Sequence, residues 1–423
     1  MRKGDLFRSF ENIFVVLCFL IASGGLLPLL YIKSGAPLDS LVGNPLSGAV
    51  LAVFYFIVLM LFLANKSLFS KAVCVVQRNK LLFIFLFYLM VSISWSGSLM
   101  LSIVRGLALI GATIFGIYFF IRYDRSQQLK LLFWTFGIAA FLSLLFAIFM
   151  STYGIDFNLG SEGVWQGIFA FKNTLGISMC LGAILSLVGM LKKREERKSF
   201  FIEFIVFVMC FFLLMASTAV GPLFCFVGVF VLFLGFLIYR TNKSISLPLF
   251  IFFISIIIIA IILIISNLSS FLAFFGKGDS LTGRLEIWPA VIDSIKERPF
   301  FGYGYYGFWS DPNNAYPIYS KINPDFQPTH AHNGALELVL DSGIIGLFLF
   351  LIIFYYNVKR ATIFAMRKQT AESFWPMAYF AFFFLFNVSA AMIAKNHGFF
   401  WICFVTLTLD LSEFFKSNKL QRQ

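Results

Sequence analysis

Apolar residues occur along the chain in long runs that short polar segments separate. The runs are 11–32, 46–64, 80–96, 99–121, 129–150, 168–191, 200–217, 220–239, 246–267, 335–357, 373–392 and 397–415. A transmembrane helix needs about 20 consecutive apolar residues, and each run is close to that length. The pattern therefore predicts an all-α, polytopic membrane protein with about twelve transmembrane helices.

One polar segment, residues 268–334, is far longer than the others. It divides the chain into residues 1–267, which carry the first nine predicted helices, and residues 335–423, which carry three helices and a short tail. Within this segment, residues 281–299 have apolar side chains at helical spacing, which predicts an amphipathic helix on the membrane face. The remainder is rich in glycine, aromatic residues and proline, and predicts an irregular loop.

Composition and charge support insertion in a membrane and indicate an orientation. The chain is 60% hydrophobic and 13% charged, whereas soluble domains are roughly half apolar and a quarter charged. The net charge is +13. Because most Lys and Arg lie in the short segments between apolar runs, the pattern is typical of cytoplasmic loops rather than of a nucleic-acid-binding surface. Both termini are expected in the cytoplasm, with the long polar segment on the outer face.

Two of the three histidines, His330 and His332, lie directly before the apolar run that starts at 335. Asn333 is a good N-cap and is expected to start that helix. His332 then stands at a helix N-terminus, where a positive charge is disfavoured, and a neutral imidazole there can accept a proton from a hydroxyl. His332 is the candidate general base, with His330 and Asn333 in supporting roles.

Two other interpretations of the histidines remain open at this stage. They can be interfacial polar residues without chemistry. They can also be part of a metal site, because the spacing of His330 and His332 suits two ligands, and Asp325 or Asp341 would then have to complete the set.

Basic residues outside the cytoplasmic clusters are candidates for binding an anion. Arg105, Lys172, Arg284 and Lys395 are predicted at or inside the outer half of the membrane, where a charge is costly and suggests a function. Arg284 and Lys172 together can hold a diphosphate. The alternative is that these side chains snorkel to the lipid headgroups.

Aromatic residues are concentrated near the middle of the long polar segment. Trp288, Tyr303, Tyr305 and Trp309 offer ring faces on which sugars can stack, while the alternative is an aromatic belt at the membrane interface. The chain has no phosphate-binding loop and no dinucleotide-binding fingerprint. No nucleotide or other organic cofactor is therefore expected, and the energy for a reaction at the outer face would have to come with a substrate such as a lipid diphosphate.

The segment 332–346 resembles the signature of the O-antigen ligase and polysaccharide polymerase superfamily. That signature is His followed by Asn, Ser or Gln, then nine residues, then Gly-x-x-Gly. Here it is matched by His332-Asn333, the nine residues 334–342, and Gly343-Ile344-Ile345-Gly346.

Four further segments are similar to parts of the same family. They are TGRLEIW, which contains Arg284; RPFFGYGYYGFW, 298–309; GIFAFKNTLG, 167–176, which resembles the exopolysaccharide-production branch; and NVSAAMIAKNHGFFW, 387–401. The stretch ASTAVGP, 216–222, lacks the basic residue of many relatives. The resemblance therefore assigns diphosphate contacts to Arg284 and to Lys172 or Arg105.

The resemblance implies a metal-independent, inverting glycosyltransferase of GT-C-like architecture in the bacterial inner membrane. It would move a glycan from an undecaprenyl-diphosphate carrier to an acceptor hydroxyl at the periplasmic face, most simply as a polysaccharide polymerase. An O-antigen ligase acting on lipid A core, or a protein O-glycan ligase, is the alternative within the family, and a lipid-linked glycan flippase is the alternative from another class. Expected partners are the lipid-linked donor, the acceptor, membrane lipid and a chain-length regulator or flippase.

Overall fold

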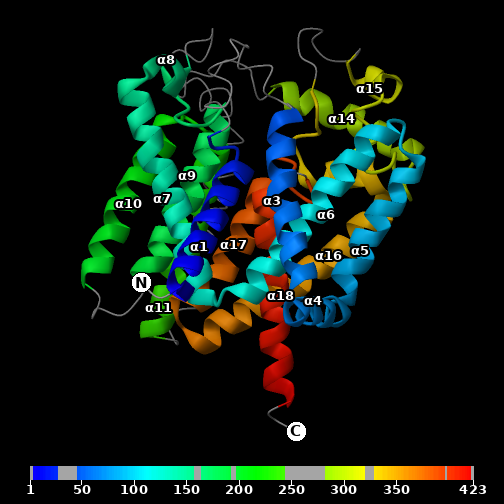
Figure 1. Ribbon diagram of the computed structural model, residues 1–423. Helices are drawn as coiled ribbons and strands as arrows, with labels where there is room; N and C mark the ends of the chain where they lie inside the picture. The colour runs from blue at the N-terminus through cyan, green and yellow to red at the C-terminus, as the bar shows by residue number, and fades with distance from the viewer. Residues whose placement is uncertain are drawn as a thin grey trace.

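The computed structural model describes residues 3–26, 45–156, 163–191, 197–242, 282–319, 328–395 and 398–420. The predicted helix 246–267 and the first part of the long polar segment, 268–281, lie outside these residues. The described chain forms one bundle of helices that pack side by side (Figure 1).

Every predicted apolar run within the described chain corresponds to a helix. These helices are α1 (Lys3–Ala22), α3 (Pro45–Ala64), α5 (Lys80–Ser92), α6 (Leu99–Arg122), α7 (Arg125–Phe149), α9 (Lys172–Met190), α10 (Arg197–Ala216), α11 (Val220–Thr241), α16 (Gly334–Lys368), α17 (Ala371–Asn387) and α18 (Gly398–Leu420). Among the described residues six helices are long and apolar enough to cross a membrane. A helical, polytopic membrane protein is therefore confirmed, whereas the total of twelve spans stays a prediction.

Smaller elements in three regions of the chain differ from the sequence prediction. The segment predicted as a charged loop after α3 is an amphipathic helix, α4 (Lys66–Arg78), bent by 106° from α3. Part of the predicted irregular loop is a short helix, α15 (Pro312–Tyr319). After α7, a single helical turn, α8 (Ser151–Gly154), leads into β1 (Ile155–Asp156), which pairs with β2 (Val164–Trp165), so the fold is not wholly α-helical. Counting charges and apolar runs does not detect such short elements.

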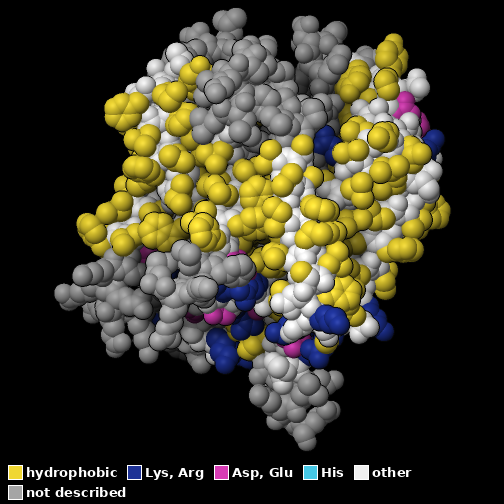
Figure 2. Space-filling view, viewed as in Figure 1, with side chains coloured by type: hydrophobic (Ala, Val, Ile, Leu, Met, Phe, Trp, Pro, Cys, Tyr) yellow, Lys and Arg dark blue, Asp and Glu magenta, His cyan; other side chains and the backbone are white. Residues whose placement is uncertain are grey.

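The bundle has two distinct ends. α8, α15 and α14 (Thr282–Glu297) lie at one end, and the start of α1 and the last turns of α18 lie at the other (Figure 1). Figure 2 shows an apolar belt around the visible face, with most of the visible Lys and Arg side chains gathered at the end where α18 finishes. This arrangement agrees with cytoplasmic termini and an outer α14, which remain predictions relative to the cell.

Polar bonds between helices hold the inner bundle together. On α6, Thr113 Oγ1 accepts a hydrogen bond from Trp401 Nε1 of α18 at 2.8 Å. Asn357 Nδ2 on α16 donates to Thr408 Oγ1 on α18 at 2.7 Å. Lipid offers no hydrophobic driving force between helices, so such bonds and close packing determine which helix faces associate.

Helix α16 is broken within its first half. Gly343 has φ +66° and ψ −174°, a conformation that glycine alone adopts readily. A Cβ at this position would overlap the carbonyl oxygen of Phe300. The break is therefore where the segment after α14 packs directly on the α16 backbone.

The segment 299–303 satisfies the backbone groups that the break leaves unpaired. Tyr303 N donates to Leu340 O at 2.7 Å, and Ile344 N donates to Pro299 O at 2.8 Å. Tyr88 OH donates to Ser342 O at 2.7 Å. A broken helix is tolerated within a bundle because protein groups replace the missing bonds. The outer segment is in this way fixed to the membrane helix that follows the histidines.

We expect Gly343→Ala to lower the stability of the protein, because alanine is strained at this φ and its methyl group overlaps Phe300. Strain of this kind costs on the order of 1–3 kcal/mol before the overlap is counted. The measurement is thermal unfolding of the purified protein in detergent. The control is Gly48→Ala in α3, where an added Cβ meets nothing within 4 Å. Equal unfolding temperatures for Gly343→Ala and the wild type would contradict this account of the helix break.

Candidate active site

The predicted helix start at Asn333 is present in the structure. Asn333 is the N-cap of α16, and its Oδ1 accepts hydrogen bonds from Ala335 N at 3.0 Å and Leu336 N at 3.1 Å. Its Nδ2 donates to Val388 O at 3.3 Å. Asn333 therefore both starts α16 and ties the histidine turn to the segment after α17.

His330 and His332 lie together at the N-terminus of α16. Their ring centroids are 4.0 Å apart with an interplanar angle of 41°. His332 has φ +50°, a left-handed conformation that is unfavourable for a residue other than glycine. The backbone therefore turns at His332, and the two imidazole rings are neighbours. Strain of this kind persists only where surrounding contacts hold the residue in place.

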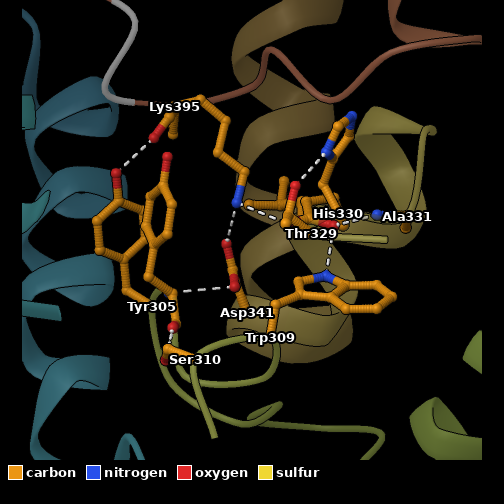
Figure 3. Close-up of polar contacts among 12 residues, drawn as sticks. Tyr305, Trp309, Ser310, Thr329, His330, Ala331, Asp341 and Lys395 are labelled. Carbon is orange, nitrogen blue, oxygen red and sulfur yellow. Dashed lines mark hydrogen bonds and ion pairs between the residues drawn. The ribbon is translucent and has the colours of Figure 1, made fainter. Parts of the chain in front are cut away.

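A buried ion network lies beneath the histidine turn. Lys395 Nζ is 2.7 Å from Glu337 Oε1 and 2.9 Å from Asp341 Oδ2. The exposed fractions are 5% for Lys395 and 2% for each carboxylate residue. Figure 3 shows Lys395 reaching from the segment between α17 and α18 to the two carboxylates. Glu337 and Asp341 are four residues apart on α16, so they face the same side of the helix.

The second oxygen of Glu337 binds the turn itself. Glu337 Oε2 accepts hydrogen bonds from Ala331 N at 2.7 Å and from Trp309 Nε1 at 3.0 Å. The carbonyl of Ala331 accepts a hydrogen bond from Trp288 Nε1 at 3.0 Å. Ala331, between the two histidines, is thus held through both its N–H and its C=O.

The charge on Lys395 is stabilised by its partners. Burial alone lowers the pKa of Lys395, but the negative charges of Asp341 and Glu337 outweigh burial and raise it. The ammonium group is therefore protonated at neutral pH. Three buried charges can coexist here because each is paired and hydrogen-bonded.

Tyr306 connects this network to Arg105 on α6. The backbone N–H of Tyr306, which has φ +57°, donates to Asp341 Oδ1 at 3.1 Å. Lys395 Nζ lies 4.0 Å from the centroid of the Tyr306 ring, and Arg105 Cζ lies 5.5 Å from the same centroid. The structure thus brings Arg105, one of the predicted anion-binding residues, next to the ion network.

Two of the four aromatic residues predicted to stack on a glycan are buried. Tyr303 and Tyr305 have exposed fractions of 3% and 1%. Tyr303 OH donates to Ser294 O, and Tyr305 OH donates to Ala394 O at 2.6 Å. Side chains buried this far have no free ring face, so their prediction as stacking residues is corrected to a structural role. Trp288 and Trp309 are only half-buried.

The other predicted cations lie near the same end of the bundle. Arg284 is in the first turn of α14, and its side chain lies outside the described residues. Lys172 is the first residue of α9. Gly176, four residues after Lys172, packs closely on the turn between α10 and α11, because a Cβ added there would meet Ser217 and Ala219. Gly221 in turn lies close to Ser389, because a Cβ added at Gly221 would approach the Ser389 side chain.

These contacts link segments that are far apart in the sequence. The start of α9 packs on the 217–222 turn, that turn approaches residue 389, and the neighbouring Val388 accepts the hydrogen bond from Asn333. The segments 167–176, 216–222, 387–401 and 332–346 therefore converge at one end of the bundle.

The metal interpretation has no ligand set within the described chain. In those residues, no three or more His, Cys, Asp or Glu side chains lie close enough together to hold a metal ion. Asp341, considered as a third ligand, instead pairs with Lys395. Asp325, the other candidate, lies outside the described residues.

The sequence prediction missed Glu337, singled out Lys395 as an outer basic residue without giving it a role, and considered Asp341 only for metal. The sequence contained a signal, because two carboxylates four residues apart within an apolar run are costly in a membrane and are almost always paired with another polar or charged group. Lys395 is a basic residue in another apolar region. Pairing the two groups requires the fold, since they are more than 50 residues apart.

Comparison with known proteins relates the site to a family. Residues 204–351 match the family model described as O-Antigen ligase. This range contains α14, the histidine turn and the first half of α16. It therefore includes most of the residues whose geometry is described above.

Similar proteins come from two groups of bacteria. The exopolysaccharide production protein ExoQ of Rhizobium meliloti (strain 1021) is 24% identical over 291 residues, 66% of this chain and 65% of the relative. A protein of Rickettsia prowazekii (strain Madrid E) that carries the name polysaccharide ligase is 38% identical over 84 residues, 19% of this chain and 20% of the relative. A polysaccharide ligase by name from Rickettsia felis (strain ATCC VR-1525 / URRWXCal2) is 37% identical over 83 residues, with the same coverage.

The matches to these relatives are partial, because the chain spans less than two thirds of the length of each. The family model nevertheless matches the segment that carries the His-Asn-x9-Gly-x-x-Gly signature, and the relatives carry names of polysaccharide production and ligation. The chain is therefore similar to O-antigen ligases over residues 204–351 and to proteins named for polysaccharide production and ligation.

Proposed function

We propose that this protein is an inner-membrane glycosyltransferase that transfers a glycan from undecaprenyl diphosphate to an acceptor hydroxyl at the periplasmic face. The observation that carries the proposal is the histidine turn, which buried contacts hold in a strained conformation at the mouth of the bundle. Strain that the surroundings maintain is concentrated at functional sites. The match of residues 204–351 to the O-antigen ligase family model supports this class of reaction.

His332 is the general base of this proposal. The acceptor hydroxyl oxygen attacks the anomeric carbon of the donor glycan, and its proton passes to His332. The bond from that carbon to the carrier diphosphate breaks, and undecaprenyl diphosphate leaves. Attack from the face opposite the leaving group inverts the anomeric centre. His330, whose ring is adjacent, supports His332.

Arg284, Lys172 and Arg105 are the proposed contacts to the diphosphate. Negative charge develops on the leaving group in the transition state, and fixed cations stabilise it electrostatically without a metal ion. Arg105 is supported by its place beside Tyr306 and the ion network. Trp288 and Trp309 remain the proposed glycan-stacking residues, because both indole rings are only half-buried.

We infer that the acceptor is a lipid-linked repeat unit, which makes the protein a polysaccharide polymerase. The Lys172-Asn173 segment resembles the exopolysaccharide-production branch, and the similarity to an exopolysaccharide production protein covers 66% of this chain. The second candidate is a ligase that uses lipid A core or a protein side chain, which the names of the rickettsial relatives favour. A glycan flippase catalyses no proton transfer and would not need a histidine turn held in a fixed conformation.

We expect His332→Ala to lower the rate of glycan transfer by roughly 10²–10⁴-fold, the usual contribution of a general base. His330→Ala is expected to have a much smaller effect, because that residue only supports the base. The measurement is polymer formation by purified protein, with size-exclusion chromatography as the control for folding. Polymer synthesis at the wild-type rate in His332→Ala would exclude the proposed base.

We expect Arg284→Ala to lower the transfer rate at least about tenfold, because a cation that stabilises the leaving diphosphate is lost. Arg284→Lys should restore part of the rate. The matched control is Lys296→Ala, which removes a positive charge from the same helix, where Lys296 is exposed and pairs with Asp293 at 3.0 Å. If both alanine variants lose the same activity, general charge rather than a diphosphate contact explains the effect.

A reconstituted assay separates polymerase from ligase. Purified protein in detergent receives the lipid-diphosphate-linked repeat unit of the host, with EDTA and no other acceptor. We expect a ladder of longer lipid-linked glycans. Transfer that occurs only after lipid A core is added would identify a ligase, and a ladder that EDTA abolishes would contradict metal independence.

A further inference from the structure

We propose that Glu337 and Trp288 are positioning residues that clamp the backbone of Ala331 and thereby hold His332 in its reactive orientation. The proposal rests on the proposed function, in which His332 is the base. Neither residue has to touch the reacting atoms for this role.

The clamp holds the two peptide groups that precede the Cα of His332. Glu337 Oε2 accepts the N–H of Ala331 at 2.7 Å, which fixes the peptide group between residues 330 and 331. Trp288 Nε1 donates to the C=O of Ala331 at 3.0 Å, which fixes the peptide group between residues 331 and 332. Ala331 is fully buried, so water does not compete for either bond.

The backbone of His332 needs such a clamp. At φ +50° it occupies a region that is unfavourable for a β-substituted residue. Without outside contacts the turn would relax towards φ values below zero and carry the imidazole ring with it. Asn333 holds the following residue through the N-cap. The clamp and the cap therefore fix the chain on both sides of His332.

Glu337 is itself held by groups from other parts of the fold. Its Oε1 pairs with Lys395, and its Oε2 also accepts Trp309 Nε1. Figure 3 shows Lys395, Trp309 and Ala331 gathered around the same group of polar contacts. Lys395 comes from between α17 and α18, so the C-terminal helices determine where the Glu337 carboxylate can lie.

Trp288 adds a connection to the proposed diphosphate contact. It lies four residues after Arg284 on α14, so the two residues are on the same side of that helix. The bond from Trp288 to Ala331 ties the helix that carries Arg284 to the turn that carries His332. Base and leaving-group contact are thereby held at a fixed separation, which a transfer reaction requires.

Two substitutions of Glu337 separate the hydrogen bond from the charge. Ala331 N and Trp309 Nε1 both donate to Glu337 Oε2. Glu337→Gln removes the negative charge but retains one side-chain oxygen that can accept both hydrogen bonds. Glu337→Met has a similar length and no oxygen. We expect Glu337→Met to lower kcat by roughly 10–100-fold with the KM for the lipid-linked donor changed less than about threefold. Glu337→Gln should restore most of the rate.

Trp288→Phe tests the hydrogen bond to the carbonyl of Ala331. This substitution retains an aromatic side chain, so it also provides a test if Glu337→Met does not fold. Phenylalanine retains an aromatic face on which a sugar can stack, but it lacks the N–H group that donates to the carbonyl oxygen of Ala331. We expect a lower kcat and little change in KM. A raised KM with an unchanged kcat would show that Trp288 acts by stacking on the glycan and would overturn its part in the clamp.

Hydrogen–deuterium exchange gives a readout that does not depend on activity. We expect the amide of Ala331 to exchange faster in Glu337→Met than in the wild type or Glu337→Gln, measured on the peptide that contains residues 329–336 of the purified full chain. The matched control is Asn357→Leu, which removes a buried bond from the same helix, α16. That variant should leave both the exchange of this peptide and kcat unchanged.

The outcomes distinguish this inference from the proposed function. Unchanged exchange and unchanged kcat in Glu337→Met overturn the clamp, even if His332→Ala is inactive. A Glu337→Gln protein as slow as Glu337→Met also overturns it, because charge would then matter and not the bond to Ala331. Faster exchange in Glu337→Met together with a fully active His332→Ala variant would support the clamp and reject His332 as the base.

Discussion

The ion network of Lys395, Glu337 and Asp341 is the interaction on which the site depends. Removing an ammonium group and two carboxylates from water is costly, and the cost is offset only when every charge is paired and hydrogen-bonded. Here the partners come from the start of α16, from the segment between α17 and α18, and from residues 306–309. The network forms only when these three regions are in place together, so the charges select one arrangement of the outer end of the bundle.

The break in α16 has a similar effect on the backbone. Gly343 interrupts the helix, and the freed N–H and C=O groups are satisfied by residues 299–303 and by Tyr88. The outer segment is thus part of the bundle rather than a separate lid. The first glycine of the Gly-x-x-Gly sequence, Gly343, therefore has a physical role, because any side chain there would overlap the backbone of residue 300. The segment 332–346 thus encodes a helix start at Asn333 and a helix break at Gly343.

Charge balance links this arrangement to the proposed chemistry. The carboxylates of Glu337 and Asp341 would repel a nearby diphosphate. Two cations, Lys395 and Arg105, lie against the ring of Tyr306 beside these carboxylates and counter that repulsion. Lys395 neutralises part of the carboxylate charge, and its partners keep it protonated. Glu337 and Asp341 can therefore hold the backbone through hydrogen bonds while the surrounding cations keep the site suitable for an anionic donor.

The sequence by itself determined the long apolar helices, because the length of an apolar run is a local property. It also determined the N-cap at Asn333 and singled out His330 and His332, which follow from residues within a few positions of one another. Only the tertiary structure decided that Tyr303 and Tyr305 are buried, that α4 and α15 are helices, and that Lys395 pairs with Glu337 and Asp341. The reason is that burial and ion pairing depend on contacts between residues distant in the chain, and no local pattern records which charges share a buried site.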